Sequence, residues 1–319
     1  MSPVSFISRS LIIISFLLVV VSLQAQQERQ YTQFFSNKLA INPAYAGEDR
    51  IGSITAIYRN QWLQFEGAPI SQLITLNTPL FTPKVGFGLG LYHNTIGIFE
   101  TYEASMAYSY DLINRPKHSL RIGIQGSLRN FKIDVNSPLI YTIDPNDPSL
   151  ANVEPSKIYG NVGMGIYLNI NKFYVGFSTP RFFDNTIGFN SISDLTAKEV
   201  AHYYIMTGLT LPISSDVDVQ TNILGKYVKG APFVMDINGN LIFSQTFTIG
   251  LGYRTGGDSY GDAMDLNVQY LFNKLIGFGV AYDYTLSKIN KVSSGTVEAL
   301  VRINFNNNKD NLHNPRFFF

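Results

Sequence analysis

The chain has 319 residues, enough for one large domain or two small ones, and its net charge of +1 gives no electrostatic reason to expect nucleic acid or an acidic partner. It contains no cysteine, which excludes disulfides, a thiol nucleophile and cysteine-ligated metal. Only 15% of the residues are charged, whereas 19 are Tyr and 23 are Phe, a balance that favours aromatic-girdled β structure over a soluble helical enzyme.

Residues 1–25 are typical of an export signal. Arg9 supplies a basic residue, 11–21 form an apolar core, and Leu23-Gln24-Ala25 ends in a small residue suited to cleavage. A membrane anchor is the alternative, but a spanning helix needs ~18 apolar residues and this run has about a dozen. We predict cleavage near Ala25, which leaves a mature chain that is periplasmic, secreted or in the outer membrane.

Residues 26–50 form a polar lead-in with scattered aromatic side chains. Tyr31, Phe34 and Phe35 recur at roughly helical spacing, which favours a short helix that Asn42-Pro43 would end. An irregular peptide is the alternative.

From residue 51 to residue 305 apolar and polar residues alternate with period two. One clear case sets Leu120, Ile122 and Ile124 against Arg121 and Gln125. The alternation predicts about fourteen strands of roughly nine to twelve residues, the length that a tilted strand needs to cross a bilayer.

The lengths of the links between strands separate a barrel from a soluble sandwich. Alternate links are short, at 78–84, 113–118, 171–172, 212–216, 243–245 and 273. The others are mostly longer, at 61–68, 131–157, 181–200, 255–262 and 287–294. Short turns on one side and long loops on the other are typical of outer-membrane barrels. We therefore predict an all-β protein, a closed antiparallel transmembrane β-barrel at 51–305 with both termini periplasmic and a periplasmic tail at 306–319.

The polar faces of the strands are predicted to line the lumen, and several carry glycine. These residues are Gly86, Gly88, Gly90, Gly250, Gly252, Gly277 and Gly279. Our first interpretation is that small residues relieve crowding where the strands curve strongly. The alternative is that they leave room for a plug, for which the lead-in at 26–47 is the candidate.

Enzyme chemistry finds little support in the sequence, so we predict a protein that is not an enzyme and needs no cofactor. The four histidines are scattered outside any metal-ligand spacing, and no GxSxG elbow is present. Asp144, Asn146 and Asp147 in a long loop could hold Ca²⁺, but turn chemistry explains an Asp-Pro-Asn-Asp-Pro run equally well and is preferred.

Two further segments are candidates for contact with partners. Trp62 and Phe65 follow the first strand, where they could be interfacial anchors or, beside Arg59, Gln61 and Glu66, an exposed recognition loop. The chain also continues past the last strand to three consecutive phenylalanines, which are costly to leave exposed and therefore favour a docking role for the tail.

Three motifs in order resemble those of the PorP/SprF family, outer-membrane proteins of the Bacteroidetes type IX secretion system. They are Asn42-Pro43-Ala44-Tyr45-Ala46-Gly47, then Asn60-Gln61-Trp62 with Phe65-Glu66-Gly67-Ala68-Pro69, and finally Asn314-Pro315-Arg316-Phe317-Phe318. Gln64 and Glu66 stand where the family more often has Gly and Asp, which blurs any role of single residues in that loop.

The resemblance implies an outer-membrane component that aids the export or surface attachment of cargo with a C-terminal sorting domain, including gliding adhesins. The implied partners are the ring and motor components of the same system. The residues expected to bind partners are Asn42, Pro43, Tyr45, Gly47, Gln61, Trp62, Phe65, Gly67, Pro69, Asn314, Pro315, Arg316, Phe317 and Phe318. The alternative function is a general outer-membrane channel or hydrophobic-solute transporter; a barrel enzyme that acts on lipids would need a catalytic cluster that the sequence does not show.

Overall fold

The structure is a computed structural model that describes residues 30–115, 117–134, 137–139, 156–188, 196–258, 261–273 and 275–305. The predicted export signal, the alternative calcium ligands Asp144, Asn146 and Asp147, and the tail at 306–319 lie outside these residues. Within the described part of the chain, no helix is both long and apolar enough to cross a bilayer.

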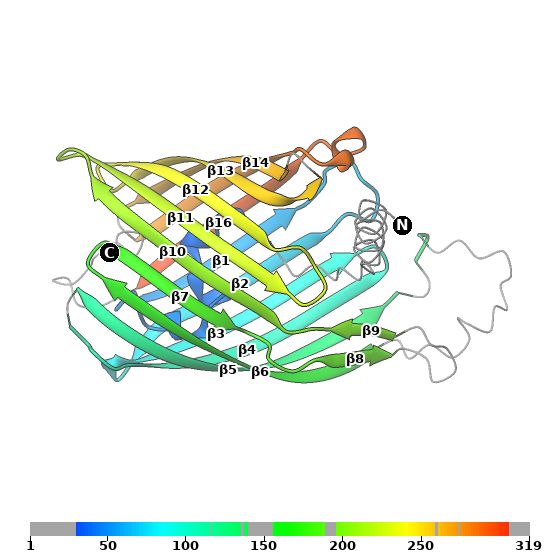
Figure 1. Cartoon of the computed structure of the whole chain (residues 1–319), viewed down its shortest axis with the longest axis horizontal. Coiled ribbons are helices and arrows are strands. Elements are labelled where there is room, and N and C mark those ends of the chain that lie inside the picture. The colour runs from blue at the N-terminus through cyan, green and yellow to red at the C-terminus, as the bar shows by residue number, and fades with distance from the viewer. Residues whose placement is uncertain are drawn as a thin grey trace, which may run out of the picture.

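Fourteen antiparallel strands form a closed barrel (Figure 1), as the alternation and the link lengths predict. The first strand, β1 (Gly52–Asn60), pairs along its whole length with the last, β16 (Thr296–Phe305). The strands between them are β2 (Ile70–Leu80), β3 (Thr82–Ile96), β4 (Phe99–Asp111), β5 (His118–Ile133), β6 (Ser156–Ile170), β7 (Phe173–Thr179), β10 (His202–Pro212), β11 (Val217–Val228), β12 (Val234–Phe243), β13 (Phe247–Asp258), β14 (Gly261–Phe272) and β15 (Ile276–Thr285). Closure gives each of these fourteen strands a hydrogen-bonded neighbour on both sides, as a bilayer requires.

The two faces of the wall are sorted in the opposite way to those of a soluble protein. On β16, Glu298 and Arg302 are buried inside the barrel, whereas Val301, Ile303 and Phe305 are exposed on the outer wall. An apolar outer face is stable only where lipid covers it, so this pattern agrees with a transmembrane barrel.

The short turns lie at one end of the barrel and the long connections at the other (Figure 1). The connection from β7 to β10 carries an extra hairpin of β8 (Asn185–Gly188) and β9 (Thr196–Glu199), and the one from β15 to β16 carries the single turn η4 (Lys288–Lys291). In outer-membrane barrels the short-turn end faces the periplasm. That both termini are periplasmic stays a prediction.

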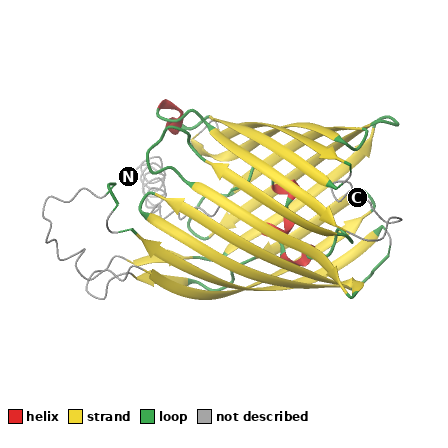
Figure 2. Ribbon diagram, turned by 180° about the vertical axis from the view of Figure 1, so that it is seen from behind, coloured by secondary structure: helices red, strands yellow, loops and turns green. Residues whose placement is uncertain are grey.

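Residues 30–51 lie inside the barrel (Figure 2), and we call them the plug. The single short helix predicted here is wrong. The plug instead forms three one-turn 3₁₀ helices, η1 (Phe34–Ser36), η2 (Lys38–Ala40) and η3 (Pro43–Tyr45). Asn42-Pro43 begins the third helix rather than ending one, because Asn42 caps it and proline fits the first helical position.

Candidate functional site

The plug descends through the lumen from the mouth, where the long connections are, to the short-turn end. Its first part contacts Arg59, the next-to-last residue of β1, and its last part enters β1 at Gly52. Between the plug and the mouth lies a cavity of ≈ 30 Å³. Such a volume holds about one or two water molecules.

Glycines of the barrel wall make room for the plug. A Cβ atom at Gly86 would lie 1.9 Å from the carbonyl oxygen of Ala46, and one at Gly123 would lie 2.4 Å from the backbone nitrogen of Ala44. Both distances are far below van der Waals contact, so the plug backbone rests where a side chain would otherwise stand. Gly88, Gly165, Gly176 and Gly279 likewise face plug side chains.

These contacts correct our first interpretation of the inward glycines. Strand curvature does not explain Gly86, Gly88 and Gly279, because the plug fills the space beside each of them, as the alternative proposed. Gly250 and Gly252 differ, since a Cβ atom there would meet the side chains of Asn240 and Asp265 on neighbouring strands.

The first predicted motif docks the plug against the wall. The Asn42 side chain accepts a hydrogen bond from the backbone of Ala44 (2.9 Å) and donates one to the carbonyl of Ile166 on β6 (3.0 Å). Gly47 adopts φ +69°, which favours glycine, and donates to Asn77 Oδ1 at 2.6 Å. Asn42, Pro43 and Tyr45 are all buried, so their predicted contact with a partner is not available while the plug is seated.

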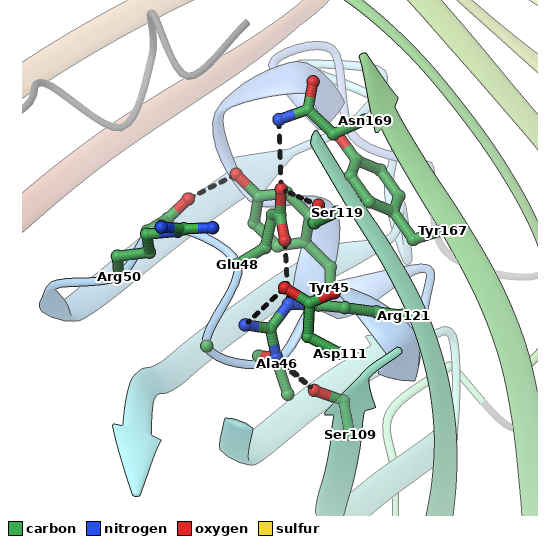
Figure 3. A network of polar contacts seen from close by, with 12 residues as sticks. Tyr45, Ala46, Glu48, Arg50, Ser109, Asp111, Ser119, Arg121, Tyr167 and Asn169 are labelled. Carbon is green, nitrogen blue, oxygen red and sulfur yellow. Dashed lines mark hydrogen bonds and ion pairs between the residues drawn. The ribbon is translucent and has the colours of Figure 1, made fainter. Parts of the chain in front are cut away.

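A lower clamp of two ion pairs holds the end of the plug at the short turns, and Figure 3 shows the pair of Glu48 with Arg121. Arg121 Nε donates to Glu48 Oε2 at 2.8 Å, and Ser119 donates to the other carboxylate oxygen at 2.6 Å. The adjacent Asp49 pairs with Arg302 of β16. All of these side chains are buried, and removal of one partner from such a pair is strongly destabilising.

An upper clamp holds the start of the plug near the mouth. Glu298 accepts hydrogen bonds from the backbone nitrogens of Thr32 and Gln33, each at 2.8 Å. Arg59 pairs with Asp283 at 2.7 Å and with Glu298 at 3.2 Å. Arg59 is 1% exposed, so its predicted place in an exposed recognition loop is wrong.

Between the clamps, one plug lysine sits among tyrosine rings. Lys38 Nζ lies 3.7 Å from the ring centroid of Tyr174 and 5.4 Å from that of Tyr45, and its hydrogen bond to Tyr167 Oη measures 3.5 Å. Burial lowers the pKa of Lys38 to about 7, while Asp49 and Glu48 act in the opposite direction. Burial therefore disfavours the charged form of this lysine, whereas the acidic and aromatic side chains around it favour that form.

A third charged cluster lies at the mouth. Arg129 pairs with Glu103 on β4 and with Glu199 on β9, the latter at 2.6 Å. Arg181 reaches the same two carboxylates at 3.4 and 3.3 Å. These pairs tie the long connection between β7 and β10 across the lumen above the plug.

The second predicted motif lies at the mouth, in residues 61–69, which we call the mouth loop. Gln61 donates to the carbonyl of Pro69 at 2.9 Å, which closes the loop, and Gly97 donates to the carbonyl of Gly67 at 2.8 Å. The ring of Trp62 packs edge-on against Phe65 with centroids 6.5 Å apart, and Phe65 is 46% exposed. The loop is thus ordered by its neighbours while an aromatic side chain stays open to solvent.

The structure therefore separates the predicted residues into two regions. The first motif is buried at the lower half of the plug, and the mouth loop lies at the opposite end of the barrel. Asn314, Pro315, Arg316, Phe317 and Phe318 lie outside the described residues. No cluster of His, Asp or Glu suited to a metal occurs within the described part of the chain.

The sequence prediction missed the two clamps. Alternation places Arg121 on the lumen face of its strand, and the same pattern does so for Glu298 and Arg302, but no local feature of the sequence identifies the partner of each charge. Glu48 and Asp49 follow the first motif directly, and two adjacent acids beside a docking motif were the available signal.

Comparison with known proteins gives both a family and a fold. A family model described as "Type IX secretion system membrane protein PorP/SprF" matches residues 23–303. Two solved barrels with a similar fold are a "TodX deltaS2S3 mutant monoaromatic hydrocarbon channel" (TM-score 0.51, 12% identity, 84% of this chain and 94% of that one) and the "CymD monoaromatic hydrocarbon channel" (0.50, 10%, 86% and 92%). At such low identity the likeness shows a common fold alone. No curated protein sequence matches the chain.

Proposed function

The chain belongs to the PorP/SprF family of type IX secretion system membrane proteins, and from this premise we propose that it is an accessory barrel that aids the export or surface attachment of sorting-domain cargo, gliding adhesins among them. The family and the transmembrane barrel support a position in the outer membrane. Ring and motor components at the periplasmic side are the proposed partners.

The plugged lumen is the observation that carries this proposal. Two buried clamps, at Glu298 and at Glu48, hold the barrel's own chain across its centre. A barrel filled in this way is poorly suited to conduct solutes and well suited to present rigid surfaces at both ends. Its work in secretion is therefore assigned to those two ends.

At the short-turn end, the proposed contact surface centres on Phe81 in the turn between β2 and β3. Phe81 is 96% exposed and has φ +61°. The left-handed positions of three other short turns hold asparagine, at Asn114, Asn171 and Asn273, and the turn between β12 and β13 holds Ser244 and Gln245. A bulky residue in this conformation costs about 1–2 kcal/mol relative to a permissive one, so an exposed phenylalanine here favours a contact role.

At the mouth, the proposed contact surface is the mouth loop with its exposed Phe65 and its neighbour Trp62. Aromatic anchors on ordered loops are the residue type that dominates protein interfaces. We assign cargo recognition to this end, because the long connections of an outer-membrane barrel face the cell exterior.

The experiment that tests the function compares surface-bound and secreted proteins in cells with and without this gene, together with an envelope pull-down on the tagged protein. We expect one or more sorting-domain proteins to be lost from the surface and restored by the wild-type gene, with ring components in the pull-down. An unchanged set of surface proteins would overturn the proposal.

The second candidate function is a channel for hydrophobic solutes. Its support is the common fold with two proteins described as monoaromatic hydrocarbon channels. Planar-bilayer conductance separates the candidates. We expect the wild-type barrel to be nearly silent and a variant that lacks residues 30–50 to conduct. Equal conductance of the two proteins, with uptake of a monoaromatic hydrocarbon, would favour the channel.

A further inference from the structure

The outer wall carries an apolar groove over β2 to β6, away from the plug and from both proposed contact surfaces. Its volume is ≈ 460 Å³, and its lipid-facing lining includes Ile74, Leu91, Ala104, Leu128 and Ile158. Ala104 makes the floor low, because its cross-strand neighbours Leu91 and Leu128 are bulky and stand on either side of it. The shape of the groove is therefore set by the order of large and small residues across β3, β4 and β5.

Toward the mouth, the same outer face changes from apolar to polar directly above the groove. His93 Nε2 lies 2.9 Å from Glu100 Oε1, and Tyr102 Oη donates to the same oxygen at 2.6 Å. Asn130 accepts a hydrogen bond from Ser156 at 2.6 Å. Such a change marks the level where lipid chains end and headgroups begin.

Lys132 is the cation of this polar rim. Its Nζ lies 4.8 Å from the ring centroid of Tyr102, and no ion pair to a carboxylate within 4.0 Å is formed by it in the described part of the chain. The nearby Glu100 is already engaged by His93 and Tyr102. The rim thus offers an ammonium group, and the Glu100 carboxylate beside it is already hydrogen-bonded.

A groove in a bilayer must be filled, because an empty space forfeits the dispersion contacts of its lining. Apolarity alone does not select the occupant, since lipid chains are as apolar as leucine. Selection comes from shape and from the polar end of the molecule. An acyl chain fits the groove below the rim, and a phosphate held at the chain's polar end would meet Lys132.

From these observations we propose that the groove over β2 to β6 binds a phosphate-bearing lipid of the outer leaflet, one acyl chain along Ala104 and the phosphate at Lys132. This site is independent of the secretion role. Lys132 supplies the charge, and the low floor at Ala104 supplies the shape.

The test uses the full-length mature protein purified in detergent, with phosphatidic acid as the probe and native mass spectrometry to measure the lipid bound per barrel. Lys132→Ala removes the charge, and Ala104→Leu fills the floor. Ala299→Leu is the matched control, because Ala299 is an exposed alanine on the outer face of β16, outside the groove. Heat-modifiable migration on gels verifies that each barrel is folded.

We expect Lys132→Ala and Ala104→Leu each to weaken phosphatidic acid binding by roughly tenfold, and Ala299→Leu to bind as the wild type does. Diacylglycerol with the same chains should bind more weakly than phosphatidic acid, and inorganic phosphate should not compete. Equal binding by all four proteins, or equal binding of diacylglycerol and phosphatidic acid, would overturn the site. Competition by inorganic phosphate would do so as well, by indicating a free-phosphate site.

Discussion

The plug and the mouth loop look alike in the sequence and do opposite things in the molecule. Each carries an aromatic residue, an alanine and a glycine within a short motif, at 42–47 and at 61–69. The first is buried against glycines of the wall, whereas the second leaves Phe65 46% exposed. A motif alone therefore does not separate residues that hold a fold together from residues that face a partner; burial does.

The difference also indicates which measurement tests each region. Changes in the plug should alter the stability of the barrel and the state of its lumen. Changes in the mouth loop should leave both intact and alter secretion. The variants below test this division, beginning with the largest expected loss of stability.

Removal of Arg121 should be the most damaging single change. Arg121→Met leaves the buried Glu48 carboxylate without its cation, at a cost of about 3–5 kcal/mol. Urea unfolding in lipid vesicles measures this loss. The control is the double variant Arg121→Met, Glu48→Gln, which should recover part of the loss because it removes the unpaired charge of Glu48, while the buried Asp111 still lacks its cation. Wild-type stability of Arg121→Met would mean that the lower clamp does not hold the plug.

Overpacking of the wall beneath the plug should have the next largest effect. Gly86→Val places a Cβ atom 1.9 Å from the Ala46 carbonyl oxygen, so the plug must shift, at a cost of about 1–3 kcal/mol. We expect conductance to appear in planar bilayers. Gly239→Val is the matched control, since Gly239 is exposed on the outer face of β12 with open space beside it. Similar conductance from both variants would contradict a role for Gly86 in seating the plug.

The buried lysine should make stability depend on pH. The folded pKa of Lys38 is about 7, below the ordinary lysine value of 10.5. Between these values the unfolded chain binds more protons, so stability rises with pH, by up to about 1.4 kcal/mol per unit, and the penalty is full below pH 7. Lys38→Met should remove this slope from the unfolding midpoints measured between pH 7 and pH 10. An unchanged slope would show that other groups cause it.

The barrel was predictable from the sequence, and the interior of the lumen was not. Alternation such as that of Glu298 and Arg302 against Val301 and Ile303 is a local signal. The link lengths distinguish the short-turn end of the barrel from the end with the long connections. The clamps instead join residues far apart, such as Glu48 with Arg121 and Thr32 with Glu298. A pairing of that kind depends on how closed strands place their lumen faces, which a one-dimensional pattern does not contain.

The turn at Phe81 offers a change that should stabilise the barrel while it removes a contact. Asparagine tolerates the left-handed conformation far better, so Phe81→Asn should raise stability by about 1 kcal/mol. If Phe81 contacts the periplasmic ring, the same variant should recover less ring protein in the envelope pull-down. Asn114→Gly, in another short turn, should leave recovery unchanged. Full recovery with Phe81→Asn would remove Phe81 from the proposed contact surface.

Trp62→Ala should have the smallest effect on the barrel and the clearest effect on its function. The side chain packs on Phe65 at the mouth and touches neither clamp, so stability should change by less than about 1 kcal/mol. Loss of sorting-domain cargo from the cell surface, at normal barrel levels, is the expected result. Phe233→Ala removes an exposed aromatic from another connection at the same end and should keep cargo in place. If Trp62→Ala also retains its cargo, the mouth loop is an interfacial anchor. The plug and the mouth loop would then differ in burial but not in contact with a partner.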